Sequence, residues 1–239
     1  MSELKKVALV TGGSGYVGDS ILQALSSSNW HVINISRTFS SCPGIENVVC
    51  NCADENEVRD AVQQIVRTHP TISAFIHAAA APIVRASILD TTAEQFDSQF
   101  EVSVRGLYLI MRELRQHMEE GAACIGITTR SIEPNEKTER RIGAYLASKQ
   151  AERALLRSLA AELEPHIRVY AVAPGFMPGG LNSDLPEGVR AILGRQRDGT
   201  PGSAKQVGEV VAELCIHREV FPAGVSISLP SLTVTPLEW

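Results

Sequence analysis

A tyrosine and a lysine lie four residues apart in a segment with a helical pattern. Tyr145 and Lys149 stand near the start of residues 141–163, where apolar residues recur at helical spacing. Side chains four residues apart share one face of a helix. An ammonium group beside a phenol favours the phenolate and lowers the pKa of the phenol toward neutrality, which suits a general acid or base. The alternative is a structural helix with one aromatic anchor and one solvated lysine.

The same pattern predicts which face of this helix is buried. The expected buried stripe consists of apolar side chains at roughly helical spacing: Ala144, Ala147, Ala151, Leu155, Leu159 and Leu163. The charged side chains of Glu152, Arg153 and Arg157 are expected to face water. Whether Tyr145 and Lys149 do chemistry therefore depends on what the rest of the chain places beside them.

A glycine-rich turn lies between a predicted strand and a predicted helix near the N-terminus. The apolar run 5–11 is typical of a strand buried on both faces, and a helical pattern begins after Gly18. Between them stands Gly12-Gly13-Ser14-Gly15-Tyr16-Val17-Gly18. Glycines permit a tight turn and let the backbone approach a pyrophosphate at the positive N-terminus of a helix. This context favours nucleotide binding over a plain turn.

The end of the second predicted strand, residues 30–36, bears on the choice of nucleotide. An acidic side chain at this point would bind the ribose 2′-hydroxyl of NAD, but the sequence has Ser36, Arg37 and Thr38 there. A guanidinium group and a hydroxyl suit a 2′-phosphate, which arginine can bind with two hydrogen bonds. The sequence therefore predicts NADP(H) in preference to NAD(H); the competing interpretation is a solvated loop arginine.

Apolar runs and helical patterns alternate along the rest of the chain. Further strands are expected at 47–50, 73–77, 122–128, 165–173 and 225–229, and further helices at 54–67 (with Asp54 as N-cap), 92–118 and 204–217. This alternation predicts a single α/β domain over residues 1–239. It would be a doubly wound, Rossmann-like fold with a mainly parallel sheet of about seven strands flanked by helices. Ligands of such folds bind beyond the C-terminal ends of the strands, where every candidate residue lies.

Composition excludes several classes of function. The net charge is −5 and the pI is about 5.7, so no basic surface for nucleic acid is expected. No apolar run is long enough to cross a membrane, and the first residues do not resemble a signal peptide. Five cysteines cannot all pair with one another, and none stands at zinc-ligand spacing, so reduced thiols and no metal are expected. A cytoplasmic protein is the resulting expectation.

Four motifs resemble those of the short-chain dehydrogenase/reductase family. They are TGGSGYVG (11–18), FIHAAA (75–80), YLASK (145–149) and RVYAVAPG (168–175), and the resemblance extends from about Val7 to Leu229. The chain length resembles the compact single-domain branch, whereas the glycine spacing and FIHAAA look more like the longer sugar-nucleotide branch. The sequence is identified as a divergent, compact member of this family.

The resemblance implies hydride transfer with NADP(H) and assigns catalytic roles. Tyr145 would be the general acid or base, while Lys149 would lower its pKa and hydrogen-bond the nicotinamide ribose. Thr129, by its position after the strand, or Ser131, by its spacing to the tyrosine, would polarise the carbonyl. Ser103 stands where the family usually has an asparagine that holds a water for proton relay.

The resemblance also implies the contacts of the cofactor. Asn51 matches an aspartate that commonly contacts adenine, Gly179 matches a threonine that often holds the carboxamide, and residues 77–80 replace an Asn-Asn-Ala-Gly loop. The closing glycine-rich strand end is replaced by residues 229–234. The expected cofactor-binding residues are Gly12, Ser14, Gly15, Tyr16, Val17, Gly18, Ser36, Arg37, Thr38, Asn51, Cys52, Ala78, Ala79, Ala80, Lys149, Pro174, Gly175 and Met177.

Two further expectations follow from the resemblance. Residues 176–202 would be a lid over a partly apolar substrate. The chain would form a homodimer or homotetramer through the helices at 92–118 and 141–163. A helix at such an interface needs a second apolar face, for which Tyr108, Ile110 and Met111 are candidates.

The resulting hypothesis is a ketoreductase-type, NADP(H)-dependent oxidoreductase. It would reduce a carbonyl group, or oxidise a secondary alcohol, of a small and partly apolar metabolite, with Tyr145 as the general acid or base. One alternative is a dinucleotide-binding sensor or partner subunit without catalysis. Another is a biosynthetic enzyme that uses the same scaffold for dehydration or isomerisation.

Overall fold

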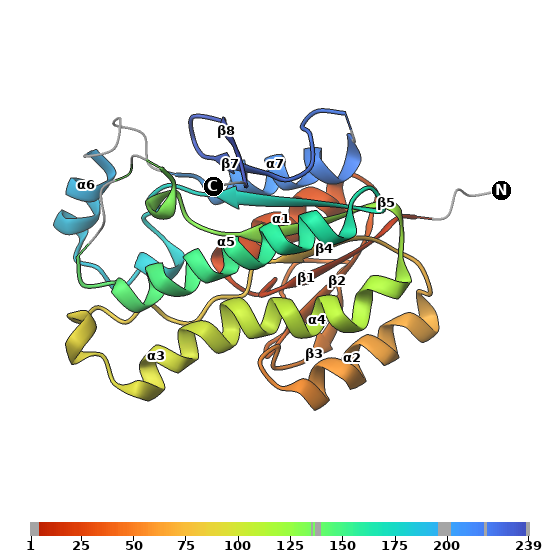
Figure 1. The fold of residues 1–239 in the computed structure, drawn as a ribbon, viewed down its shortest axis with the longest axis horizontal. Helices are drawn as coiled ribbons and strands as arrows, with labels where there is room; N and C mark the ends of the chain where they lie inside the picture. Colours follow the sequence, from red (N-terminus) through yellow and green to blue (C-terminus); the bar gives the residue numbers. More distant parts are fainter. Residues whose placement is uncertain (1–4, 135, 137–139, 196–201, 218, 238–239) are drawn as a thin grey trace.

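Eight strands form one sheet in this protein. The computed structural model describes residues 5–134, 136, 140–195, 202–217 and 219–237. The strands are β1 (Val7–Thr11), β2 (His31–Ser36), β3 (Glu46–Val49), β4 (Ile72–His77), β5 (Met118–Ile127), β6 (Ile167–Ala173), β7 (Val225–Ser228) and β8 (Thr233–Pro236). Their order is β3-β2-β1-β4-β5-β6-β7-β8, and all neighbouring pairs are parallel except β7 and β8 (Figure 1). The predicted Rossmann-like α/β fold is confirmed.

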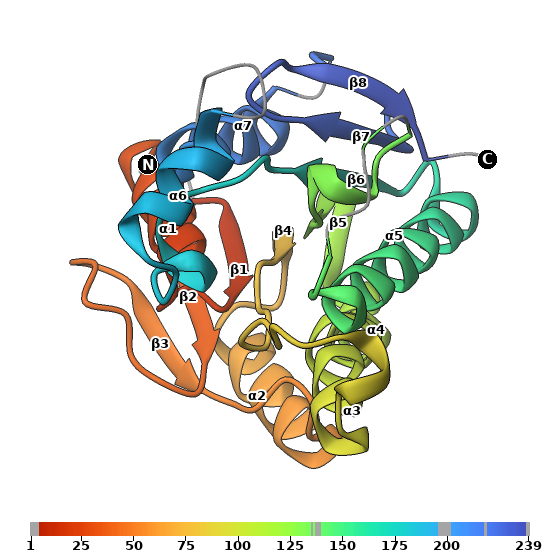
Figure 2. The same cartoon turned by 90° about the vertical axis from the view of Figure 1, so that its left-hand side faces the viewer.

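Helices cover both faces of the sheet. On one face lie α1 (Tyr16–Ser27) and α7 (Ala204–Ile216), and on the other lie α2 (Glu55–Thr68), α4 (Gly106–Leu114) and α5 (Gly143–Leu163) (Figure 2). The remaining elements are α3 (Ala93–Phe100), α6 (Glu187–Arg195), a π-helical segment η2 (Glu101–Arg105), and the short 3₁₀ segments η1 (Ile88–Asp90), η3 (Arg115–His117), η4 (Arg130–Ile132) and η5 (Gly180–Asn182).

The strands are apolar on both sides because each helix layer needs a surface to pack on. Leu9 and Phe75 point into the core shared with α2, α4 and α5, whereas their neighbours Val10 and Ile76 point into the core shared with α1 and α7. All four side chains are completely buried. This is the burial expected of parallel strands between two helical layers, and it agrees with the short, continuously apolar runs of the sequence.

The last strand, β8, is absent from the sequence-based expectation of about seven strands. It pairs antiparallel with β7 at the edge of the sheet and is largely exposed. An exposed edge strand has no buried face to enforce an apolar pattern, and Pro236 within it disfavours a strand in any other position. The signal on which the other strands were predicted is therefore missing here.

The expected helix at 92–118 is present but not uniform. Thr92 caps α3 with a capping box to Gln95. Five π-helical residues then connect α3 to α4, and β5 begins at Met118, earlier than expected. A π-helical insertion is rare and is often found at functional sites. The predicted N-cap of the preceding helix α2 is confirmed, because the Asp54 carboxylate accepts hydrogen bonds from two backbone N–H groups.

The predicted buried face of α5 is confirmed at Ala144, and Leu155, Leu159 and Leu163 are partly buried against the core, but the prediction is wrong at two positions. Ala147 is exposed, whereas Glu152, expected in water, is fully buried. The buried stripe runs at four-residue intervals through Ala144, Ser148, Glu152, Leu156 and Ala160, with Lys149 beside it. Apolarity alone cannot locate this face, because an acid and a base that bond to each other can be buried together.

The second apolar face proposed for α4 is also wrong in part. Ile110 and Met111 are buried in the protein's own core, while Tyr108 is half-exposed and so is Phe96 on α3. The five cysteines are free thiols, as expected. Among the described residues, none of the helices combines the length and apolarity that a membrane crossing requires.

Candidate active site

The turn between β1 and α1 can only be built with glycine at its first position. Gly12 has a φ of +68°, a region that side chains disfavour, and a Cβ placed on it would lie 2.7 Å from Cα of Ala79. The loop after β4 therefore packs directly against this turn. Gly15 precedes α1 without any side-chain cap, so the first N–H groups of the helix are available to an anion.

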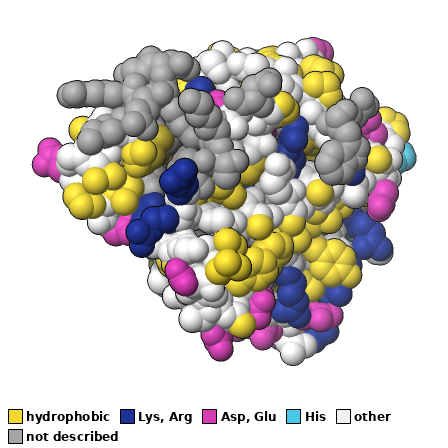
Figure 3. Space-filling view, turned by 60° about the vertical axis from the view of Figure 1, so that its left-hand side comes forward, with side chains coloured by type: hydrophobic (Ala, Val, Ile, Leu, Met, Phe, Trp, Pro, Cys, Tyr) yellow, Lys and Arg dark blue, Asp and Glu magenta, His cyan; other side chains and the backbone are white. Residues whose placement is uncertain are grey.

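A cavity of about 670 Å³ opens beyond the C-terminal ends of the strands. Figure 3 shows this side of the molecule, where hydrophobic side chains gather next to lysine and arginine. The structure brings every predicted cofactor-binding residue to the cavity wall: Gly12, Ser14, Gly15, Tyr16, Val17, Gly18, Ser36, Arg37, Thr38, Asn51, Cys52, Ala78, Ala79, Ala80, Lys149, Pro174, Gly175 and Met177. The predicted catalytic residues Tyr145, Lys149, Thr129 and Ser131 line it as well.

The end of the cavity near β2 is marked by Arg37. Its side chain is exposed. Burial raises the pKa of the Cys52 thiol to about 11, and the positive charge of Arg37 acts in the opposite direction. Ser36 is nearly buried and donates its hydroxyl proton to Oδ1 of Asn34 at 2.7 Å, so it has no proton left for a phosphate. Thr38 donates to the hydroxyl of Ser14 at 2.9 Å, which links this loop to the glycine turn.

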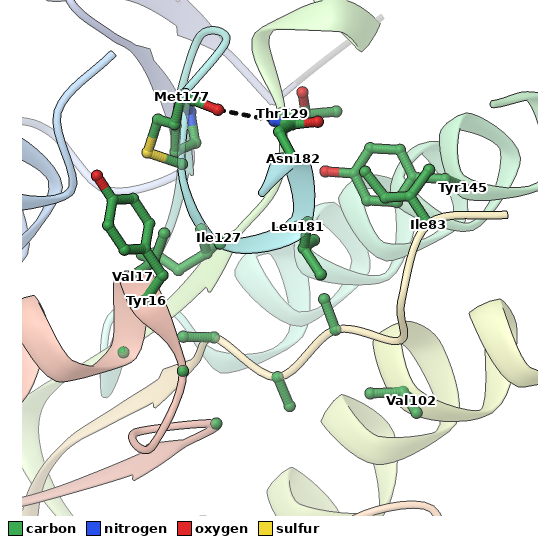
Figure 4. A pocket seen from close by; sticks show the side chains of 18 of the residues that line it. Tyr16, Val17, Ile83, Val102, Ile127, Thr129, Tyr145, Met177, Leu181 and Asn182 are labelled. Atoms are coloured by element: carbon green, nitrogen blue, oxygen red, sulfur yellow. Dashed lines mark hydrogen bonds between the residues drawn. The ribbon is translucent and has the colours of Figure 1, made fainter. Parts of the chain in front are cut away.

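Tyr145 and Lys149 both reach the cavity from the first turns of α5. The ring of Tyr145 extends from the helix with its hydroxyl directed into the cavity (Figure 4). Lys149 is 2% exposed, and its Nζ donates to the carbonyl of Ile127 at 2.8 Å and to Oε2 of Glu152 at 2.6 Å. An ammonium group has three donors, so one remains for a ligand in the cavity.

Thr129 and Ser131 stand on the same wall, after β5. Thr129 caps η4, and its Oγ1 accepts a hydrogen bond from the backbone N–H of Ser131 at 3.4 Å. A hydroxyl that accepts in this way keeps its own proton to donate. The geometry thus leaves Thr129 able to bond a carbonyl oxygen, and it gives Ser131 a part in orienting that hydroxyl.

Glu152 is a residue of this site that the sequence did not reveal. It is fully buried behind Lys149, and among the described residues its second oxygen, Oε1, has no hydrogen-bond partner. Burial raises the pKa of Glu152 to about 7, against the charge and hydrogen bond of Lys149, which lower it. The available signal was its spacing, because residues three apart on a helix can pair.

His77 connects the end of β1 to the π-helical segment. Its ring is completely buried between the hydroxyl of Thr11, 2.9 Å from Nδ1, and the carbonyl of Val102, 3.1 Å from Nε2. Since a carbonyl can only accept, Nε2 carries the proton and Nδ1 accepts from Thr11. Burial, reinforced by the charge of Lys149, lowers the pKa of His77 to about 3, so the ring is neutral.

The expectation for Ser103 is not met by its position. Ser103 is 1% exposed and does not line the cavity, where Val102 takes its place. The π-helical segment to which both belong changes which side chain faces the cavity. Sequence alignment to a regular helix could not anticipate that change.

The segment predicted as a lid closes one side of the cavity. From it, Met177, Leu181, Asn182 and Leu193 line the wall, and the Asn182 amide donates to the carbonyl of Met177 at 2.9 Å (Figure 4). Residues 196–201 of this segment lie outside the described part of the chain. Other lining residues that the sequence did not indicate are Ile83, Arg85, Val102 and Ile142; they are mostly apolar loop residues without a motif.

Arg85 attaches the loop after β4 to the segment predicted as a lid. It donates to Oδ1 of Asn182 at 2.7 Å and to the carbonyl of Leu181 at 3.0 Å, and its Nε lies 3.3 Å from Asp184. A guanidinium group holds several acceptors in one fixed plane. These bonds therefore position η5 over the cavity.

Tyr16 explains the glycine found where the family often has a threonine. A Cβ placed on Gly179 would lie 2.8 Å from Cζ of the Tyr16 ring, and one on Gly180 would lie 2.8 Å from its Cβ. Gly180 also has a φ of +61°. The ring of Tyr16 thus occupies the space into which a side chain at 179 would project.

Comparison with known proteins finds relatives that match nearly the whole chain. A family model described as enoyl-(acyl carrier protein) reductase matches residues 30–228. The chain is 30% identical to carbonyl reductase [NADPH] 2 of Sus scrofa and 28% identical to L-xylulose reductase of Mesocricetus auratus; each match covers 92% of this chain and 93% of the relative. The structure of 3-ketoacyl-(acyl-carrier-protein) reductase from Brucella melitensis complexed with NADH superimposes with a TM-score of 0.83 at 21% identity, covering 95% of this chain and 98% of the other.

Proposed function

Because the chain belongs to the short-chain dehydrogenase/reductase family of oxidoreductases, we propose that it reduces the carbonyl group of a small, partly apolar metabolite with NADP(H), or oxidises the corresponding secondary alcohol. The observation that carries this proposal is the meeting of Tyr145, Lys149 and Thr129 on the wall of one cavity with the glycine turn. In the same proposal the chain forms one nucleotide-binding domain, and residues 176–202 are its substrate lid.

The cavity suits a dinucleotide. The turn after β1 presents backbone N–H groups at the start of α1, and no side chain at Gly12 could fit beside Ala79. A positive side chain, Arg37, stands where an acid would select the ribose 2′-hydroxyl of NAD. These features favour NADP(H). Because Ser36 and Thr38 already donate their hydroxyl protons, Arg37 and Ser14 are the side chains that would hold the 2′-phosphate.

The protein's own residues supply the proton and orient the substrate. When bound, the cofactor supplies a hydride equivalent to the carbonyl carbon. Thr129 donates a hydrogen bond to the carbonyl oxygen, which draws electron density toward that atom. The phenol of Tyr145 then gives its proton to the same oxygen as charge develops there. Lys149 stabilises the phenolate that remains, and its free donor is available to the ribose.

A panel of carbonyl compounds tests this proposal. Purified protein is mixed with NADPH and each compound, and NADPH oxidation is followed by absorbance. We expect turnover with at least one compound and a loss of about 10²–10⁴-fold in kcat for Tyr145→Phe. Tyr108→Phe, which alters a half-exposed tyrosine on α4 away from the cavity, serves as the control. Failure to bind NADPH, or unchanged turnover in Tyr145→Phe, contradicts the proposal.

The position of Ser103 favours one alternative function. Ser103 replaces the asparagine that usually holds the relay water in the family, and its side chain is buried and does not line the cavity. A protein that binds the dinucleotide without turning it over, as a sensor or partner subunit, is consistent with this. Tight NADPH binding together with no turnover across the panel would support that alternative.

Self-association is a further part of the proposal. Members of the family are commonly oligomeric, and the half-exposed rings of Phe96 and Tyr108 lie on the α3–α4 side of the protein. We expect a homodimer or homotetramer through the helices at 92–118 and 141–163. Analytical ultracentrifugation measures the mass directly, and a monomer at micromolar concentration contradicts this expectation.

A further inference from the structure

Behind the catalytic lysine lies an acid that the mechanism above does not use. We propose that Glu152 is a positioning residue that fixes the ammonium group of Lys149 and offsets part of its positive charge at Tyr145. The inference rests on the proposed function, in which Tyr145 exchanges the proton. In this inference, Glu152 sets the pH at which Tyr145 exchanges its proton.

The geometry makes Glu152 the charge partner of Lys149. Oε2 of Glu152 lies 2.6 Å from Nζ, both side chains are essentially out of solvent, and the two residues are one helical turn apart. A pair that is shielded from water interacts far more strongly than a surface pair. The second contact of Nζ is a neutral carbonyl, that of Ile127, so it provides position but no compensating charge.

The groups on neighbouring elements do not provide that compensation. His77 on β4 is neutral, and burial raises the pKa of the Cys124 thiol on β5, so it stays protonated. On β6, Val169 and Ala171 face α5, while Arg168 and Tyr170 bond to each other on the side of α7.

The remaining charged groups near α5 are occupied with one another or exposed. Arg153 lies 3.7 Å from Glu133, on the side of the helix that leads to β8. Glu101 on η2 and Asp97 on α3 are exposed. Among the described residues Glu152 is therefore the acid that sets the net charge behind Tyr145.

The consequence concerns the acidity of Tyr145. A lone ammonium group beside a phenol lowers the pKa of the phenol, and an adjacent carboxylate reduces that effect. Removing the negative charge while keeping a hydrogen-bond acceptor should let the full charge of Lys149 act on Tyr145. We expect the pKa of Tyr145 in Glu152→Gln to fall by about one unit.

Tyrosinate absorbance tests this without any need for turnover. The ultraviolet difference spectrum is titrated for the wild type and for Glu152→Gln, each corrected with its Tyr145→Phe counterpart. Glu162→Gln changes an exposed acid on the same helix and is the control. Coincident Tyr145 titrations in wild type and Glu152→Gln overturn the inference. A shift in Glu152→Gln with none in Glu162→Gln or in Glu152→Asp, which keeps the charge, supports it.

The pH profile of the reaction separates this inference from the proposed function. Reduction needs protonated Tyr145, so its decline at high pH should begin about one unit lower in Glu152→Gln, while KM for NADPH stays within a few-fold. No turnover in the wild type defeats the proposed function, but the tyrosinate titration still decides on Glu152. If Glu152→Gln does not fold, the infrared band of the Glu152 carboxyl group in the wild type decides. The inference requires Glu152 to be ionised at the pH where Tyr145 titrates. A protonated Glu152 carboxyl at that pH overturns it.

A separate cluster of metal-binding side chains lies at the other end of the strands. His31 starts β2, Glu46 starts β3 and His69 follows α2, and both Nε2 atoms point at Oε2 of Glu46, at 2.8 and 3.1 Å. We also propose that these three residues bind a divalent transition-metal ion of the zinc type. All three are partly exposed, so an ion can enter.

The chemistry of the cluster fits such an ion. Two imidazoles and one carboxylate with an open position are a common ligand set for zinc. The three ligand atoms lie within 4.8 Å of one another. The simpler alternative is a cluster held by hydrogen bonds alone.

Zinc titration by calorimetry distinguishes the two. The full chain is stripped with a chelator and titrated with ZnCl₂ at neutral pH. We expect one site whose affinity falls by more than about tenfold in His69→Gln and in Glu46→Gln. His166→Gln is the control, because His166 also bonds a glutamate, at 2.7 Å, but does not belong to a three-ligand cluster among the described residues. Equal affinity in wild type and His69→Gln, or no binding at all, overturns the proposal.

Discussion

Two regions of the cavity differ in how closely they keep the family motifs. The β1–α1 turn and the start of α5 carry the glycines, Tyr145 and Lys149 in the expected places. The loop after β4, the π-helical segment η2 and residues 176–182 depart from the pattern at His77, Ser103 and Gly179, and of these three residues Gly179 lines the cavity. The residues proposed to bind phosphate and donate the proton are therefore retained, while residues around them are replaced.

The replacements form local sets rather than isolated changes. His77 bonds Thr11 on one side and the π-helical backbone on the other. Gly179 leaves room for the ring of Tyr16. His77 and Gly179 are therefore each accommodated by a residue of the retained glycine motif, Thr11 in the first case and Tyr16 in the second.

In the region that keeps the motifs, Gly12→Ala should be damaging. The added methyl group meets the backbone of Ala79 and forces a positive φ on alanine, so we expect the free energy of unfolding to fall by about 4 kcal/mol and NADPH binding to be lost. Gly44→Ala is the matched control: it has a φ of +77° but nothing within 4 Å, so only the backbone strain of about 1–2 kcal/mol applies. Urea denaturation measures both. Equal losses would show that the close approach is unimportant.

Glu152 gives the stability of the protein a distinctive pH dependence. Its pKa is raised to about 7 in the folded state, above the usual 4.5. Stability from a raised pKa is present below the unfolded value and lost as pH rises through the folded value. Between pH 4.5 and 7 the wild type should thus lose on the order of 3 kcal/mol relative to Glu152→Gln. Urea denaturation across this range measures it, and parallel curves for the two proteins contradict it.

Restoring the family's threonine should harm this protein. Gly179→Thr would drive a side chain into the ring of Tyr16, and we expect a loss of about 2 kcal/mol in stability or in NADPH binding. The double variant with Tyr16→Ala should recover part of that loss, which a double-mutant cycle measures as coupling. Additive effects would mean that the two positions are independent.

The smallest expected effect concerns the attachment of the lid. Arg85→Met removes the bonds to Asn182 and Leu181, so we expect KM for the substrate to rise several-fold, equivalent to about 1 kcal/mol, with little change in kcat. Asp184→Asn removes only the exposed ion-pair partner and should change KM by less than about twofold. Steady-state kinetics compares them. An equal rise of KM in both variants would show that the ion pair with Asp184 holds this segment, rather than the bonds to Asn182 and Leu181.

Local spacing in the sequence was enough to predict the parts of the site that depend on one element. The glycine turn, the Tyr145–Lys149 pair and Asp54 as a cap each require only a few neighbouring residues. The alternation of strands and helices likewise predicted the Rossmann-like sheet, apart from the exposed edge strand β8.

What the sequence could not provide depends on packing between elements. The burial of Glu152 follows from the orientation of α5 on the sheet, and the burial of Ser103 follows from a π-helical insertion that has no clear sequence signal. The apolar cavity residues Ile83 and Ile142 come from loops far apart in the chain. In each case tertiary structure decides which side of an element faces the cavity.

Transfer of deuterium from labelled NADPH tests most directly whether Tyr145 and its neighbours form a carbonyl-reducing site. The nicotinamide carbon that donates hydride is deuterated, and the alcohol formed from an active carbonyl compound is analysed by mass spectrometry and NMR. We expect deuterium at the former carbonyl carbon in the wild type and a rate lower by about 10²–10⁴-fold in Tyr145→Phe. Product without deuterium at that carbon, or labelled product formed equally fast by Tyr145→Phe, would contradict it.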